Sequence, residues 1–335
     1  MNDRVRMARA FLAVAVCAVA LVACGGNNQN PGDATGAQAT GGTGGTQAAQ
    51  ELSGDVKVDG SSTVAPLSTA AAELFAEQQA KVRVTVGTSG TGGGFEKFCN
   101  GETDISNASR PIKDEEKTAC QAKNIAYEEF SVANDALTVV VHKENTWATC
   151  LTVDQLKKMW EPGSKVSNWN QIDAKFPNEP LKLFGAGTDS GTFDYFTDVI
   201  NGEEGKSRTD YSPSEDDNVT VQGVAGSKGG LGYFGFSYFE ENADKLKAVQ
   251  VDGGDGCVGP SVQAAQDGTY QPLSRPLFIY PKAESLKRPE VLAFVEYYVA
   301  NHKQIAEDAK FIPLNAQQET ELKTALDKLK AQAGG

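Results

Sequence analysis

Short apolar runs alternate with longer amphipathic stretches through residues 54–335, and this alternation predicts strands and helices in turn. The apolar runs predict strands at 56–59, 82–86, 104–110, 137–141, 181–184, 231–236 and 277–280. Helical spacing predicts helices at 66–79, 95–100, 113–123, 152–160, after 185–193, at 290–301 and at 317–331. Strands separated by helices predict mostly parallel, helix-covered sheets. A folded body of about 285 residues is long enough for two such domains.

The first 24 residues have the features of a bacterial lipoprotein signal in the right order. Arg4, Arg6 and Arg9 give a basic start, the apolar run 11–22 is too short for a comfortable membrane span, and small residues precede Cys24. An ordinary cleaved signal peptide that contains a cysteine is the alternative. Acylation of Cys24 would hold the mature protein on the outer side of the cell membrane without spanning it.

Residues 25–53 are rich in Gly, Ala, Gln and Thr. Such a composition cannot bury a core, so we expect a disordered tether between the anchor and the folded body. Its root-mean-square reach is about 25–30 Å.

The chain carries a formal net charge of −13, and this acidity argues against a nucleic-acid partner. It does not exclude an anionic small ligand, because the local field of a site can oppose the net charge. The chain has only 2 histidines, and its cysteine spacings do not match a zinc site. We therefore expect no metal and no cofactor.

The folded body contains Cys99, Cys120, Cys150 and Cys257. An even set in an exported protein suggests disulfides, and four cysteines allow three pairings. Cys99 and Cys120 flank the segment 104–112, which favours the pairs Cys99–Cys120 and Cys150–Cys257.

The segment 104–112 (Asp-Ile-Ser-Asn-Ala-Ser-Arg-Pro-Ile) is expected to join a strand to a loop. Pro111 disfavours a helical conformation at Arg110 and ends strand pairing there. The hydroxyl of Ser109 and the guanidinium of Arg110 then lie side by side at the carboxyl end of a strand, the edge where open α/β sheets hold ligands. An arginine in a surface ion pair is the alternative interpretation.

Three predicted strands run into turns rich in glycine and hydroxyl residues, each followed by a helix: 60–63 (Gly-Ser-Ser-Thr), 87–94 and 189–192 (Asp-Ser-Gly-Thr). Helix N-termini present free N–H groups, and glycine lets a ligand approach the backbone. Each turn alone is also explained by ordinary helix capping. Together with Ser109 and Arg110, the three turns indicate one dehydrated oxyanion held mainly by neutral dipoles.

Enzymatic interpretations fit the sequence less well. A phosphate-binding loop of nucleotidases needs Gly-Lys-Ser/Thr, but Gly94 is followed by Phe95 and Glu96. The run 87–94 does not match a dinucleotide-binding fingerprint, and no Gly-x-Ser-x-Gly surrounds Ser190. No catalytic residue is therefore assigned, although a secreted hydrolase remains an alternative.

At this point the motifs resemble the phosphate-binding lipoproteins that serve the high-affinity phosphate ABC transporter. The resemblance covers roughly residues 54–315 and rests on Gly-Ser-Ser-Thr-Val, Gly-Thr-Gly-Gly-Gly-Phe, Asp-Ile-Ser-Asn-Ala-Ser-Arg-Pro-Ile and Asp-Ser-Gly-Thr in this order. It implies an α/β type II periplasmic-binding-protein fold, with two lobes of mixed sheet flanked by helices and the ligand in the cleft between them. Crossover strands are expected near 134–142 and 276–281, which gives lobe I as 54–136 with 277–335 and lobe II as 137–276.

The resemblance also implies a binding site. The matching positions are Ser62, Thr63, Thr91, Ser109, Ser190, Gly191 and Thr192. Well-known members carry an aspartate where Ser109 stands and an arginine where Ala186 stands. Arg110 is then expected to act as the only cation of the site.

The missing aspartate bears on selectivity, because phosphate near neutral pH keeps a proton and sulfate does not. Asp135, placed at the start of a crossover strand, is the candidate acceptor of that proton. An aspartate that merely ends a loop is the alternative.

The implied function is non-enzymatic: a monomer captures inorganic phosphate and delivers it to a membrane permease of an ABC transporter. The same fold serving sulfate, molybdate or a phosphonate is the alternative within the family.

Overall fold

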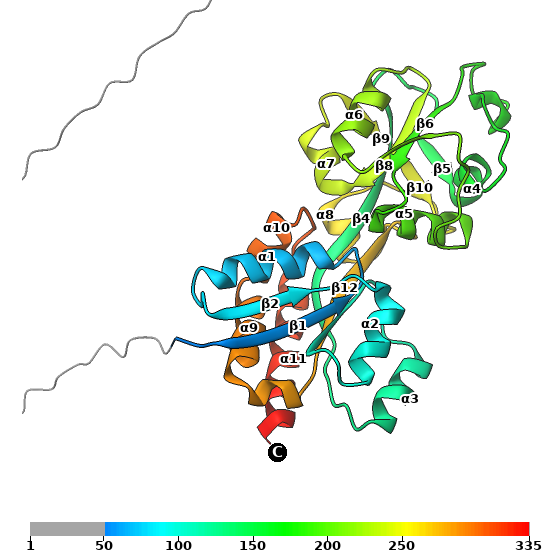
Figure 1. The fold of residues 1–335 in the computed structure, drawn as a ribbon. Helices are drawn as coiled ribbons and strands as arrows, with labels where there is room; N and C mark the ends of the chain where they lie inside the picture. Colours follow the sequence, from blue (N-terminus) through cyan, green and yellow to red (C-terminus); the bar gives the residue numbers. More distant parts are fainter. Residues whose placement is uncertain (1–50, 335) are drawn as a thin grey trace, which may run out of the picture. The chain divides into compact units, whose positions relative to one another are not determined.

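Two long antiparallel strands, β4 (Phe130–His142) and β12 (Ser274–Pro281), connect the two parts of the sheet structure (Figure 1). The computed structural model describes residues 51–334. The predicted signal peptide with Cys24, and nearly all of the predicted tether, lie outside the described residues. Register places Ser274 opposite Ala136 and Ile279 opposite Phe130, so β12 pairs with the first half of β4 only.

The main sheet has nine strands in the order β2-β1-β3-β12-β4-β8-β6-β7, with β9 also paired to β4. Its remaining strands are β1 (Gly54–Gly60), β2 (Val82–Val86), β3 (Ile105–Ala108), β6 (Lys182–Ala186), β7 (Ser212–Ser214), β8 (Gly230–Gly235) and β9 (Leu246–Ala248). The strands at both ends of this order pair in parallel, whereas β12 and β4 pair antiparallel to their neighbours. The sheet is therefore mixed, as the resemblance implied. The mostly parallel pairing expected from the alternation of strands and helices is present at both ends but not at the centre.

A second sheet of three strands is not hydrogen-bonded to the main sheet but shares the core of β4 and β8. It is formed by β5 (Cys150–Thr152), β10 (Gln250–Asp252) and β11 (Cys257–Val258). The disulfide Cys150–Cys257 joins its two outer strands. The second disulfide, Cys99–Cys120, links two helices, so both predicted pairings are present.

Helices cover both faces of the main sheet. The α-helices are α1 (Ala65–Ala76), α2 (Gly90–Cys99), α3 (Asp114–Ala122), α4 (Val153–Trp160), α5 (Gly191–Phe196), α6 (Asp217–Ala225), α7 (Phe236–Glu241), α8 (Val262–Gln266), α9 (Pro289–Ala300), α10 (His302–Asp308) and α11 (Ala316–Gly334). Short turns of other helix types occur at η1 (Trp169–Gln171), η2 (Thr197–Asn201) and η3 (Glu284–Lys287). Among the described residues, none of these helices combines the length and the apolar character needed to cross a membrane.

Strand alternation decides which core each side chain enters, because successive residues point to opposite faces. In β12, Leu277 and Ile279 enter a core with α1, α9 and α11, whereas Phe278 and Tyr280 enter a smaller core with α2 and α3. In β8, Leu231 and Tyr233 pack toward α4 and α5, and Phe234 packs toward α6.

The two largest cores contain different stretches of chain. One is built from residues within 56–133 and 277–329, and the other from residues within 136–273 together with Ile312. We call the parts built around them lobe I and lobe II. Ile312 crosses this division: it pairs with Asn134 and packs in the core of lobe II, although along the chain it lies between α10 and α11, two helices of lobe I.

Candidate functional site

A cavity of about 800 Å³ lies where lobe I meets the start of α5 and the start of β12. Six of the predicted site residues line it: Ser62, Thr63, Thr91, Ser109, Arg110 and Gly191. Arg275 and Tyr195 line it too and were not among the predicted residues. The structure therefore brings the three predicted turns and the segment 104–112 to one place.

The first turn follows β1 and lies against the end of β3. Gly60 has a φ of +140°, and a Cβ atom there would lie 2.1 Å from the carbonyl oxygen of Asn107, so glycine is required. The N–H of Ser61 donates to the same carbonyl at 2.9 Å. This contact fixes Ser62 and Thr63 at the carboxyl end of β1, where α1 begins.

The second turn is shorter than the sequence predicted, because α2 begins at Gly90 and not at Phe95. Asp59 accepts hydrogen bonds from the N–H and the hydroxyl of Ser89, which fixes the residue before the helix. A Cβ atom on Gly94 would lie 2.5 Å from the Cα of Gly60. The glycines thus let α2 pack closely on β1.

Thr91 and Ser109 form a pair of hydroxyls on the cavity wall. Their oxygens are 3.0 Å apart, and the N–H of Ser109 donates to Thr91 Oγ1 at 3.2 Å. Thr91 belongs to the first turn of α2 and Ser109 directly follows β3. Two elements of lobe I are thereby joined by groups that can also donate to an anion.

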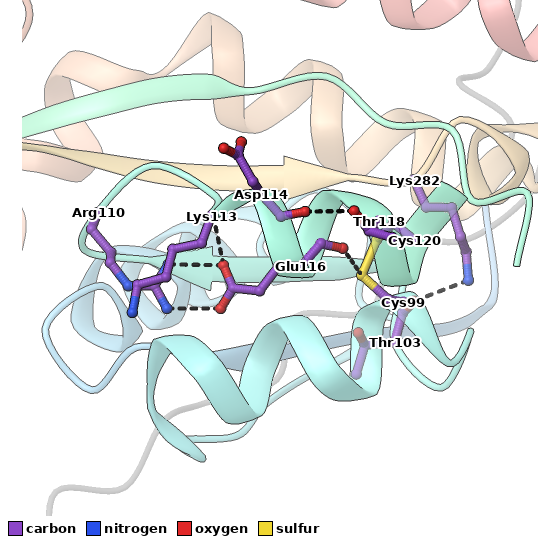
Figure 2. The surroundings of a disulfide bond; sticks show 9 residues. All are labelled: Cys99, Thr103, Arg110, Lys113, Asp114, Glu116, Thr118, Cys120 and Lys282. Atoms are coloured by element: carbon purple, nitrogen blue, oxygen red, sulfur yellow. Dashed lines mark hydrogen bonds and ion pairs between the residues drawn. A yellow bond between two sulfur atoms is a disulfide. The ribbon is translucent and has the colours of Figure 1, made fainter. Parts of the chain in front are cut away.

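Arg110 lines the same cavity but is already paired. Its two terminal nitrogens donate to Glu116 of α3 at 2.8 Å and 2.7 Å, as Figure 2 shows. Burial alone would raise the pKa of Glu116, yet the hydrogen bonds from Arg110 and from the Lys113 N–H keep that pKa below its ordinary value. The positive charge of Arg110 is therefore largely balanced within lobe I.

The Cys99–Cys120 disulfide supports this arrangement from the far end of the same helices. It joins the last residue of α2 to α3, and the backbone carbonyl of Glu116 lies 3.5 Å from the sulfur of Cys99 (Figure 2). Thr91 and Glu116 thus belong to two helices that are covalently linked.

Arg275 and Lys113 also line the cavity, which corrects the expectation that Arg110 is its only cation. The Nε of Arg275 donates to Asp135 Oδ2 at 3.2 Å, and one terminal nitrogen donates to Thr63 Oγ1 at 3.2 Å. The other terminal nitrogen is 3.4 Å from the carbonyl oxygen of Ser109. The guanidinium carbon lies 3.6 Å from the centroid of the Tyr195 ring.

Asp135 lies inside β4, not at the start of the strand or at the end of a loop as the sequence suggested. Its side chain is only 6% exposed and forms an ion pair with Arg275. Burial raises the pKa of Asp135, while the charge and hydrogen bond of Arg275 act in the opposite direction. Asp135 lines the neighbouring cavity of about 960 Å³ rather than the one lined by Arg275.

The third turn belongs to lobe II and approaches the first. Ser190 caps α5 by accepting from the N–H of Thr192 at 3.2 Å. A Cβ atom on Gly191 would lie 2.4 Å from Thr63 Oγ1, so the two turns are in close contact. Thr192 lines the neighbouring cavity, Ser62 lines both, and Ser190 lines neither.

The neighbouring cavity has an acidic wall that includes Asp217 at the start of α6. Burial, together with the charges of Asp216 and Glu215, raises the pKa of Asp217 to about 6. Among residues 51–334, no group of histidine, cysteine or acidic side chains is arranged to hold a metal ion.

The raised pKa of Asp217 gives a prediction about stability. Because the folded protein holds this proton more tightly than an unfolded chain with a pKa near 3.8, ionisation of Asp217 lowers stability as the pH rises from about 4 to about 6. We expect Asp217→Asn to raise the free energy of unfolding by about 1 kcal/mol at neutral pH. The gain is smaller than the full cost of ionising Asp217, because the substitution also removes a negative charge that is favourable in the first turn of α6. Urea unfolding followed by tryptophan fluorescence measures this, and a gain that is the same near pH 4 would contradict it.

Comparison with known proteins identifies the family to which this fold belongs. A family model described as a PBP superfamily domain matches residues 36–302. The chain belongs to this family. Protein SphX of Synechococcus elongatus is 50% identical over 264 residues, which cover 78% of this chain and 78% of that protein. Phosphate-binding protein PstS of Staphylococcus saprophyticus is 41% identical over 288 residues, covering 85% of this chain and 88% of that protein.

A solved structure shows the same fold for this PBP superfamily protein. The crystal structure of a possible phosphate binding protein from Planctomyces limnophilus superposes with a TM-score of 0.80 at 49% identity, covering 83% of this chain and 99% of that one. The predicted α/β type II periplasmic-binding-protein fold is confirmed. None of these three proteins has a name that describes an enzyme.

Sequence reasoning missed Arg275 and Tyr195 in this PBP superfamily protein. A signal for Arg275 was present, because the tripeptide Ser-Arg-Pro occurs twice, at 109–111 and at 274–276. The second copy lies where β12 begins, and β12 pairs with β3, which ends just before the first copy. Tyr195 had no such signal, since an aromatic residue in a short helix is usually a core residue.

Proposed function

We propose that this protein binds inorganic phosphate on the outer side of the cell membrane and delivers it to an ABC permease. It acts as a monomer without catalytic turnover, held to the membrane by a lipid on Cys24. Membership of the PBP superfamily and the similarity to a PstS phosphate-binding protein support this function. The lipoprotein signal predicted from residues 1–24 supports the anchor.

The observation that carries the proposal is the convergence of hydroxyls and a paired arginine on one cavity. Thr63, Thr91 and Ser109 supply hydroxyl groups, and Arg275 supplies a planar fork of donors. Ser62 and Gly191 line the same cavity. Ser190 and Thr192, the neighbours of Gly191 in the third turn, complete the proposed set, although Thr192 lines the neighbouring cavity. Neutral donors suit a dehydrated oxyanion, because burying them costs much less free energy than burying a further charged group.

We assign the main cationic role to Arg275 and a lesser role to Arg110. Well-known members of the phosphate-binding family carry an arginine at the position of Ala186, which lies in lobe II. Arg275 packs on Tyr195 of lobe II and donates to Thr63 of lobe I. It therefore supplies, from the lobe II side of the cavity, the positive charge that the family's arginine supplies at the position of Ala186. The pairing of Arg110 with Glu116 supports its lesser role.

Asp135 is proposed to select phosphate over sulfate. Its buried carboxylate lines the neighbouring cavity, which shares Ser62 with the anion cavity, and it uses one oxygen for Arg275. The remaining lone pairs can accept the proton of a phosphate ion that lies at this shared wall. We expect Asp135→Asn to reduce the phosphate-over-sulfate preference at least about tenfold, because an amide no longer repels sulfate. Calorimetric titration with both anions measures the ratio.

Asp308→Asn is the matched control for this substitution. Asp308 is an exposed aspartate on the same neighbouring cavity, and its replacement should leave the ratio unchanged. An unaltered ratio in Asp135→Asn would remove Asp135 from the proposed selectivity.

The function itself is tested by calorimetric titration of the protein with phosphate, sulfate, molybdate and a phosphonate. We expect tight one-to-one binding of phosphate and weak or no binding of the others. Preference for another anion would reassign the ligand, and sustained release of phosphate from a phosphate ester would overturn the non-enzymatic function.

A further inference from the structure

Tyr195 of α5 is a buried aromatic residue whose ring lies against a charged group of the cavity. The residue is 5% exposed, and the guanidinium carbon of Arg275 is 3.6 Å from the ring centroid. Cations within about 6 Å of an aromatic face are attracted to it, and a planar guanidinium can also stack on the ring. The contact is therefore close even for this type of interaction.

The Tyr195 ring is itself held in place. Its hydroxyl donates to the carbonyl oxygen of Pro272 at 2.6 Å, in the segment that leads into β12. Tyr195 thus contacts residues 272–275 at two points, through its hydroxyl at Pro272 and through its ring at Arg275. Rotation of the ring about its side-chain bonds would break one contact or both.

Each of the three hydrogen bonds of Arg275 is 3.2 Å or longer, at the upper end of the usual N–H···O range, so the Tyr195 ring shares in holding the guanidinium plane. These bonds go to Asp135, to Thr63 and, at 3.4 Å, to the carbonyl of Ser109. An arginine side chain has many rotamers, and each interaction that removes rotamers in advance lowers the entropic cost of binding. Neither Asp135 nor Thr63 contacts the face of the guanidinium in the way that Tyr195 does.

We propose that Tyr195 is a positioning residue of the anion site, which holds the guanidinium plane of Arg275 so that its donors face the cavity. This inference rests on the proposed function. Tyr195 does not contact the anion itself; it acts through Arg275. Its hydroxyl holds the ring in place through Pro272 and does not bind the ligand. The aromatic ring is therefore the essential part of the side chain.

A double-mutant cycle tests this role through the dissociation constant for phosphate. Tyr195→Leu removes the ring and should weaken binding about tenfold, whereas Tyr195→Phe keeps the ring and should stay within about threefold of the unchanged protein. The second arm of the cycle is Arg275→Met combined with Asp135→Asn, which leaves no buried charge unpaired. In this background Tyr195→Leu should change the dissociation constant less than about twofold.

Tyr211→Leu is the matched control for a tyrosine that is only structural. Tyr211 lies in lobe II, packs on Trp160 with ring centroids 5.3 Å apart, and donates to the carbonyl of Ala186 at 2.8 Å. Its replacement should lower the melting temperature and leave the phosphate dissociation constant unchanged.

The outcomes separate this inference from the proposed function. Equal effects of Tyr195→Leu in both backgrounds, or no effect in either, would overturn the positioning role. An unchanged dissociation constant in the Arg275→Met, Asp135→Asn protein would instead remove Arg275 from the anion site. A loss of binding in Tyr195→Phe as large as in Tyr195→Leu would show that the hydroxyl is the essential group, which also contradicts the inference.

Discussion

Gly191→Ala is expected to weaken phosphate binding by at least about 2 kcal/mol, because the added methyl group would overlap atoms of Thr63. The new Cβ would lie 2.4 Å from Thr63 Oγ1 and 3.0 Å from the backbone nitrogen of Thr63. Lobe II would have to move away from the first turn of lobe I, and the donors of both lobes would no longer reach one anion together. Calorimetric titration with phosphate measures the loss.

Gly259→Ala provides the control for this steric argument. A Cβ atom on Gly259 would have its nearest neighbour at 3.7 Å, which is ordinary contact, and Gly259 does not line the cavity. We expect its phosphate affinity to match that of the unchanged protein. A Gly191→Ala protein that binds phosphate normally would show that the two turns need not be in contact when the anion is bound.

Removing the charge of Arg275 is expected to lower phosphate affinity by about 3 kcal/mol or more, as for the loss of a charge-assisted contact in a buried site. Arg275→Ala alone would leave Asp135 buried without a partner, which destabilises the fold by itself. The informative protein is therefore Arg275→Met with Asp135→Asn. Its melting temperature without phosphate is measured beside its dissociation constant, so that a folding defect is recognised.

The same paired removal at the other arginine is the comparison. Arg110→Met with Glu116→Gln deletes an ion pair of the same kind on the same cavity. Since Glu116 already balances Arg110, we expect an affinity loss of about 1 kcal/mol or less. The reverse order of the two effects would return the main cationic role to Arg110.

Much of the fold was predictable, because most of its strands and long helices have a clear hydrophobic period. The three-stranded sheet of β5, β10 and β11 was not predicted, since strands of two or three residues are too short to show any period. The start of α2 was placed too late for a different reason. Glycine is a poor helix former, yet here the tight packing of Gly94 on Gly60 and the bonds from Ser89 to Asp59 outweigh that preference.

The candidate site was predicted in part, for the residues that stand in recognisable motifs. The three turns and Ser109 are local patterns, so their residues could be named from the sequence. The partner of Asp135 could not, because Arg275 pairs with Asp135 across 140 residues of chain. An ion pair of this kind depends on which strands become neighbours, and the antiparallel pairing of β12 with β4 was not expected from the pattern.

The way the chain is divided between the two cores has a consequence for its biogenesis. The core of lobe II is made almost entirely by one continuous stretch, 136–273, whereas the core of lobe I needs both 56–133 and 277–329. During synthesis from the N-terminus, all residues of the continuous stretch 136–273 are made before residues 277–329. Because domains generally fold as units, lobe II can fold first. The first turn leads into α1, and α1 shares its core with α9, α10 and α11. Although the lining of the cavity is present once Pro276 has emerged, the first turn is therefore fixed only when the last helices arrive.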